Sequence, residues 1–190
     1  MPNVDAVISA IANKAEPEQI GRLLYELAVT GGALPELHTL ADTFGTTLSM
    51  AGLEAVYNSC SATYTSQKSK RPYGWNMWIP VQNHIIKGMV GAGIPQNAAD
   101  ALAVLKHLYL DVDDVYFGKV EAQLIKIALR DLADIEDVID FAAELNTDRA
   151  LAIFCMAFGS DPILLSERSL RRRKEAERQA DKERKRSALL

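Results

Sequence analysis

The sequence predicts an all-α protein, an irregular bundle of about ten helices with a long, charged, projecting C-terminal helix. Apolar residues recur at intervals of three and four almost throughout the 190 residues, and no segment alternates polar and apolar residues as a half-buried strand would. Proline and glycine stand where such helices would begin and end. No internal repeat with a period of roughly 20–50 residues is present, which argues against a solenoid.

The first half of the chain is expected to form four helices, at residues 4–14, 17–31, 35–45 and 47–64. Pro17 and Pro35 each suit the first turn of a helix, where the missing N–H costs nothing. The predicted buried stripe of the first helix consists of Val4, Val7, Ile8 and Ile11. The main loop of the chain follows at residues 66–76.

Six further helices are expected after this loop. The first of them begins close to Pro80 and ends at Gly91. Its apolar stripe holds Trp78, Gln82, Ile85 and Met89, so Trp78 is predicted to be a core residue. The others are expected after a cap at Asn97, after the acidic first turn Asp113 and Asp114, at residues 134–145, at residues 147–158 with Thr147 as N-cap, and from Pro162 onward.

Charge divides the chain into an acidic helical globular domain at residues 1–165 and a basic C-terminal helix, or interaction tail, at residues 166–190. The tail carries ten Lys/Arg and five Asp/Glu, a balance of +5, so the rest of a chain whose net charge is −4 carries −9. After Leu170 the tail has almost no apolar face, and we therefore expect it to project from the body or to lie on a partner.

The tail presents a continuous basic stripe. At 100° per residue its members lie within an arc of about 80°, over a length of roughly 21 Å. They are Arg171, Lys174, Arg178, Lys182 and Lys185. Such a stripe suits the phosphates of a nucleic acid. The alternatives are docking on an acidic protein surface and a solvated helix held by its own ion pairs, such as Glu167 with Arg171.

A second basic surface is predicted around the main loop, because no Asp or Glu occurs between Glu54 and Asp100. Single-stranded nucleic acids require cations for their phosphates and ring faces for their bases. The residues predicted to supply them are Lys68, Lys70, Arg71, Tyr73, Trp75 and Lys87.

Two other patterns favour structural roles. Residues 40–57 resemble a helix-turn-helix, but residues 46–57 contain no Lys, Arg, Asn or Gln to contact base edges, which favours a plain helical corner. Residues 111–144 have a charge balance of −7. On the predicted helix 134–145 the acids lie opposite the apolar stripe, which favours a solvated face; pairing with the basic tail of another copy is the alternative.

The sequence gives little support for catalysis, cofactors or metals. His38, His84 and His107 stand on three separate predicted helices without metal-ligand spacing, and no nucleophile with its base can be recognised. Cys60 and Cys155 are expected to be small buried residues in a reducing compartment. The N-terminus lacks a secretory signal, and the most apolar run, residues 150–158, is too short to span a membrane, so a cytoplasmic location is expected.

These observations together predict a non-enzymatic helical subunit of a larger nucleoprotein assembly, which binds a nucleic-acid backbone with little sequence specificity. The expected partners are single-stranded RNA or DNA and other protein subunits or copies of the same chain, with no cofactor, no metal and no membrane. The main alternative is a protein–protein adaptor whose basic tail docks on an acidic partner. A helix-turn-helix regulator that uses residues 40–57 is a third hypothesis.

Overall fold

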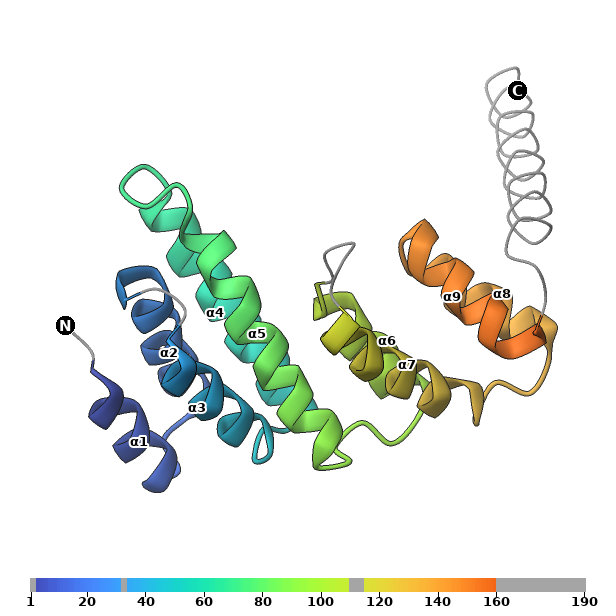
Figure 1. Ribbon diagram of the computed structural model, residues 1–190, viewed down its shortest axis with the longest axis horizontal. Helices are drawn as coiled ribbons and strands as arrows, with labels where there is room; N and C mark the ends of the chain where they lie inside the picture. Colours follow the sequence, from blue (N-terminus) through green and yellow to red (C-terminus); the bar gives the residue numbers. More distant parts are fainter. Residues whose placement is uncertain (1–2, 32–33, 110–114, 160–190) are drawn as a thin grey trace, which may run out of the picture. The chain divides into compact units, whose positions relative to one another are not determined.

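The computed structural model describes residues 3–31, 34–109 and 115–159. Every regular element in these three ranges is an α-helix, so the predicted all-α class is confirmed there (Figure 1). The helices are α1 Val4–Ala12, α2 Pro17–Gly31, α3 Pro35–Gly45, α4 Met50–Gln67, α5 Gly74–Gly91, α6 Ala98–His107, α7 Val115–Leu129, α8 Ile135–Ala143 and α9 Thr147–Phe158. The tenth predicted helix, from Pro162, and its projection from the body lie outside the described residues.

The chain divides into two compact units, one through Asp131 and one from Leu132. The first unit contains α1 to α7, and the described part of the second contains α8 and α9. The domain boundary predicted between residues 165 and 166 lies outside the described residues.

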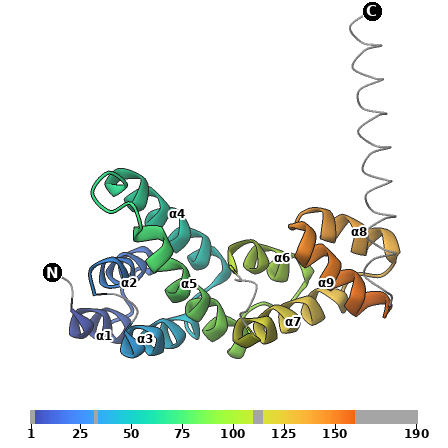
Figure 2. The same cartoon turned by 45° about the horizontal axis from the view of Figure 1, so that its top comes forward.

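Helix α5 is the central element of the first unit. It packs most extensively against α3 and also contacts α2, α6 and α7 (Figure 2). The predicted core position of Trp78 is confirmed, since its side chain is 0% exposed. The Trp78 ring meets Tyr25 of α2 edge-on at 5.9 Å between centroids. Its Nε1 donates to Gln82 Oε1 at 2.8 Å, which satisfies the buried indole N–H.

The predicted start of this helix near Pro80 is wrong, because α5 begins at Gly74 and carries Pro80 inside it. A proline in a helix interior removes one backbone hydrogen bond and crowds the carbonyl four residues earlier, at a cost of about 3 kcal/mol. The burial of Trp78, two residues before the proline, and its hydrogen bond to Gln82, two residues after it, offset this cost. Together with an α4 that continues to Gln67, past its predicted end at residue 64, this earlier start shortens the main loop from residues 66–76 to residues 68–73.

Most other helix starts follow the capping rules. Asn97 accepts a hydrogen bond from the Asp100 N–H at 2.8 Å, so its predicted cap is confirmed. The predicted cap Thr147 is instead the first helical residue, and Asn146 accepts from the Arg149 N–H at 2.9 Å. In α1 the expected stripe is rotated: Val7 and Ala10 are buried, whereas Ile8 is 48% exposed.

Helices α3 and α5 make their closest contact at a pair of glycines. A methyl group on Gly45 would overlap the carbonyl oxygen of Ile85, and a methyl group on Gly88 would overlap the carbonyl oxygen of Asp42. The absence of both side chains allows the two backbones to touch. We refer to this contact between α3 and α5 as the α3–α5 seam.

The described part of the second unit, residues 132–159, is a helical hairpin with an acidic outer face. Among these residues the buried side chains are Val138, Phe141, Ala142, Ile153 and Phe154, together with Arg149. The acids predicted to lie on the solvated face of α8 are all exposed: Asp134, Glu136, Asp137, Asp140 and Glu144. Asp134 also caps α8, because its Oδ1 accepts from the N–H groups of Glu136 and Asp137.

Candidate nucleic-acid interface

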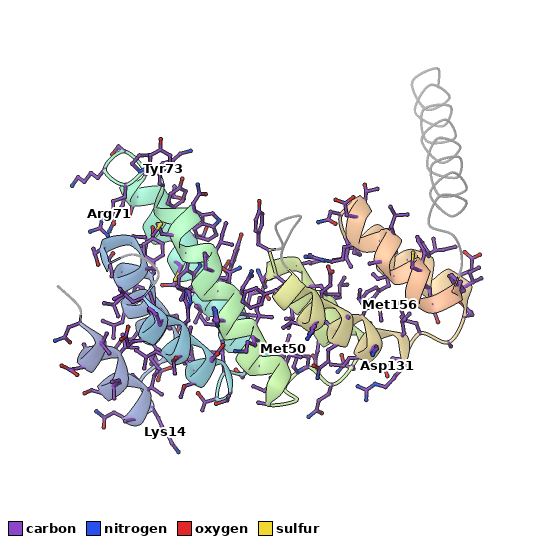
Figure 3. The ribbon with its side chains drawn as sticks, viewed as in Figure 1. Lys14, Met50, Arg71, Tyr73, Asp131 and Met156 are labelled. Carbon is purple, nitrogen blue, oxygen red and sulfur yellow. The ribbon has the colours of Figure 1, made fainter. Side chains whose placement is uncertain are left out.

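The predicted basic loop is the turn that joins α4 to α5, and we call residues 68–73 the hairpin tip. The turn is closed by its own backbone: the N–H groups of Lys70 and Arg71 donate to the Gln67 carbonyl at 2.9 Å, and the Gly74 N–H donates to the Arg71 carbonyl at 3.1 Å. These bonds hold the side chains of the tip on an ordered support. Figure 3 shows Arg71 and Tyr73 at this end of the hairpin.

The three cations of the hairpin tip differ in their surroundings. Lys68 and Lys70 are exposed. Arg71 is half-buried and donates from its guanidinium to Glu26 Oε2 of α2 at 2.8 Å. This ion pair fastens the tip to α2 and compensates much of the Arg71 charge. Lys68 and Lys70 are therefore the cations of the tip that are directed to solvent.

Tyr73 is a large hydrophobic side chain of the hairpin tip that is 74% exposed. It occupies the N-cap position of α5 but makes no side-chain capping bond there, and the first turn of α5 has no acidic residue. The N-terminus of a helix carries a partial positive charge on its unpaired N–H groups. The ring of Tyr73 thus lies on the same turn as the N-terminus of α5, Lys68 and Lys70. Each of these three groups is positive and attracts an anion.

Trp75 lies in the first turn of α5, not in a loop as predicted, and it is half-buried. Its ring is 5.7 Å from Tyr57 and 5.6 Å from Tyr64, both of α4, measured between centroids. Tyr57 in turn lies 4.4 Å from the ring of His107. The protein's own tyrosines therefore occupy much of the Trp75 surface, and Trp75 stabilises the hairpin.

Lys87 is not part of the hairpin tip. It lies near the other end of α5, thirteen residues after Gly74, which is about 20 Å along a helix. Its Nζ forms an ion pair with Asp42 Oδ2 of α3 at 2.6 Å. The residues predicted for the tail stripe, Arg171, Lys174, Arg178, Lys182 and Lys185, lie outside the described residues.

Two acidic residues that the sequence pattern does not reveal face this basic region. Residues 55–99 contain no Asp or Glu, but folding brings Glu26 to Arg71 and Asp42 to Lys87, each across 45 residues of chain. The order of residues along the chain does not indicate ion pairs between residues that lie so far apart in sequence. Of the six predicted residues in this region, the structure places four together at the hairpin tip: Lys68, Lys70, Arg71 and Tyr73.

The possible helix-turn-helix at residues 40–57 corresponds to the second half of α3, residues 46–49 and the first part of α4. Leu53, Val56 and Cys60 of α4 are buried. The exposed positions nearby include Glu54, whose charge is unfavourable to a phosphate backbone. This packing is that of a helical corner in the core.

The histidine and cysteine side chains do not form a metal site in the part of the chain that the structure describes. Within the described ranges, no three His, Cys, Asp or Glu residues are grouped so that they could hold a metal ion. His38 and His84 do meet, as stacked rings across the α3–α5 seam. Cys60 is buried and Cys155 is half-buried.

Comparison with known proteins gives no match: no protein-family model, curated protein or solved structure is significantly similar to this chain. Among the helices that the structure describes, none is long and apolar enough to cross a membrane.

Proposed function

We propose that this protein is a non-enzymatic, nucleic-acid-backbone-binding helical subunit of a larger nucleoprotein assembly, with the hairpin tip as its contact for single-stranded RNA or DNA. The observation that carries the proposal is Tyr73, an aromatic ring 74% exposed on a hydrogen-bonded turn that also presents Lys68 and Lys70. An exposed ring on a turn that also carries cations can stack on a base while the phosphates are neutralised.

The parts of the tip have distinct roles in this proposal. Lys68 and Lys70 contact phosphates, the ring of Tyr73 stacks on a base, and the N-terminus of α5 adds favourable partial charge. Arg71, which is paired with Glu26, keeps the turn in its shape. Because none of these contacts depends on the identity of a base, we expect the protein to bind nucleic acids with little sequence specificity.

The basic tail supplies the second contact of the proposed function. Its sequence carries a balance of +5, against −9 for the rest of the chain. A tail that follows additional phosphates increases affinity through counterion release without adding sequence preference. Other subunits or further copies of the chain bind the same strand in the assembly.

The proposal is tested by fluorescence anisotropy of the full chain with labelled single-stranded RNA, single-stranded DNA and duplex DNA. Tyr73→Ala is expected to weaken single-strand binding about 5- to 150-fold, because one stacked base contributes about 1–3 kcal/mol. Tyr109→Ala is the matched control, since Tyr109 is 56% exposed in the same unit but outside the tip. Equal losses in both variants would exclude the tip as the stacking site.

A salt titration tests the lysines separately. The double variant Lys68→Ala/Lys70→Ala is expected to reduce the slope of log K against log salt by about 1.4, or about 0.7 for each lost phosphate contact. Lys119→Ala/Lys126→Ala removes two exposed lysines from α7 and is expected to leave the slope unchanged. If the full chain binds none of the three nucleic acids at low salt, the proposal fails and the adaptor with an acidic protein partner becomes the better hypothesis.

A further inference from the structure

The α3–α5 seam contains a compact group of titratable side chains that the proposed function does not use. The rings of His38 (α3) and His84 (α5) stack with centroids 4.3 Å apart and planes 13° from parallel. His84 Nδ1 lies 2.9 Å from Asp42 Oδ1, and Lys87 Nζ lies 2.6 Å from Asp42 Oδ2. Asp42 and His38 are both on α3, and His84 and Lys87 are both on α5, so the group spans the seam.

The two imidazoles are held in this stack from several sides. Phe117 of α7 contacts the ring of His84 edge-on at 5.2 Å between centroids. One helical turn beyond Asp42 and His84, the Gly45 and Gly88 backbones touch and fix the spacing of the two helices. The Nε2 atom of His38 is buried without a hydrogen-bond partner, so a proton bound there would place a charge where no acceptor receives it.

We propose that the stacked pair makes the α3–α5 seam an acid-sensitive contact, which is closed when the His38 imidazole is neutral and weakened when it takes up a proton. A positive charge on His38 would lie against the His84 ring, in a group that already contains the ammonium of Lys87, and like charges repel one another. Asp42 supplies a carboxylate to both His84 and Lys87 and compensates part of this charge.

The pKa of His38 determines whether acid strengthens or weakens the α3–α5 seam. Burial, and then the neighbouring His84, lower the pKa of His38 below its ordinary value of 6.5, while Asp42 opposes the change. Because the unfolded chain binds this proton more readily than the folded one, the stabilisation is complete above about pH 6.5 and is lost as the pH falls through the lowered pKa. Acid therefore weakens the seam.

The coupling of the two rings is tested by NMR titration of the histidine side chains in the full chain. His84→Phe keeps an aromatic ring against His38 but removes the second imidazole, and we expect the apparent pKa of His38 to rise. His107→Phe is the matched control, because burial also lowers the pKa of His107 but its ring contact is Tyr57. An unchanged His38 titration in His84→Phe would overturn the proposal.

The weakening itself is tested by amide hydrogen exchange at about pH 7.5 and about pH 5.5, corrected for the intrinsic rates. Protection factors in α3 and α5 are expected to fall at least about tenfold more than those in α4, which packs against α2 away from the seam. His38→Phe is expected to remove most of this difference. A uniform loss of protection across the first unit, or the same loss in His38→Phe, contradicts an acid-sensitive seam.

Discussion

At the scale of single residues, Gly45 and Gly88 are the tightest constraint in the first unit. Each lacks a side chain where the carbonyl oxygen of the opposite helix lies, at Ile85 and at Asp42 respectively. Backbone cannot move aside as the end of a flexible side chain does, so any larger residue must separate α3 from α5. The same separation would disturb the His38–His84 stack and the ion pairs of Asp42.

Gly45→Ala and Gly88→Ala are each expected to destabilise the protein by about 3 kcal/mol, the upper end of the typical cost of overpacking, because the added methyl group meets backbone. Gly118→Ala on α7 is the control, because a methyl group there meets no atom within 4 Å. Alanine costs less conformational entropy than glycine in a helix, and Gly118→Ala is expected to stabilise by about 0.5–1 kcal/mol. Urea denaturation measures all three changes; similar stabilities for Gly45→Ala and Gly118→Ala would contradict the close contact.

At the scale of helices, the sequence predicted the elements well where local signals decide their limits. Pro17 and Pro35 open α2 and α3, and Asn97 caps α6, as expected. Local signals failed at α5. The rule that proline prefers the first turn misplaced the start, because the buried contacts of Trp78 with Tyr25 and Gln82, which the rule does not include, extend the helix back to Gly74.

Pro80→Ala tests this account of α5. The change restores an N–H that can donate to the Asn76 carbonyl and removes the crowding by the proline ring. Against this, alanine gives the unfolded chain more freedom, which costs up to about 1 kcal/mol. We expect a net stabilisation of about 2 kcal/mol by thermal or urea unfolding, whereas a destabilised variant would mean that the proline fits α5 without strain.

The candidate site shows the same division between local and long-range information. The composition of residues 68–75 was enough to select the hairpin tip, because lysines and aromatic residues gather there. Composition did not show that Arg71 is paired with Glu26, or that Trp75 is covered by Tyr57 and Tyr64. Only the packing of α2, α4 and α5 distinguishes the exposed Tyr73 from the half-buried Trp75.

At the scale of the whole molecule, two buried weak acids limit stability in alkali. Burial raises the pKa of the Cys60 thiol from 9.0 to about 12. Burial, followed by the charge of Glu26, also raises the pKa of Tyr25 above 10.0. Since the folded protein holds both protons more tightly than the unfolded chain, the stabilisation from Cys60 is complete below about pH 9 and is lost as the pH rises toward 12.

We therefore expect the free energy of unfolding to fall above pH 9, by up to about 1.4 kcal/mol per pH unit for each deprotonating group. Cys60→Ala is expected to reduce this slope, measured by urea denaturation between about pH 8 and about pH 10. Cys155→Ala removes a half-buried thiol from the second unit and is the control for loss of a thiol as such. A slope that is the same with and without Cys60 would show that its proton is not linked to folding.

Because α2 and α3 pack against α5, they cannot complete their packing during synthesis until α5 has been made. Helices α2 and α3 leave the ribosome before α5, and their contacts with it include Trp78 and Gly88. At about 5–20 residues per second, the 46 residues from Gly45 to Gly91 take roughly 2–9 s to add. During that interval α2 and α3, whose buried side chains include Leu24, Leu37 and Phe44, have yet to acquire α5 as a neighbour. Apolar surface of the nascent chain thus stays uncovered for several seconds, during which a chaperone can bind it.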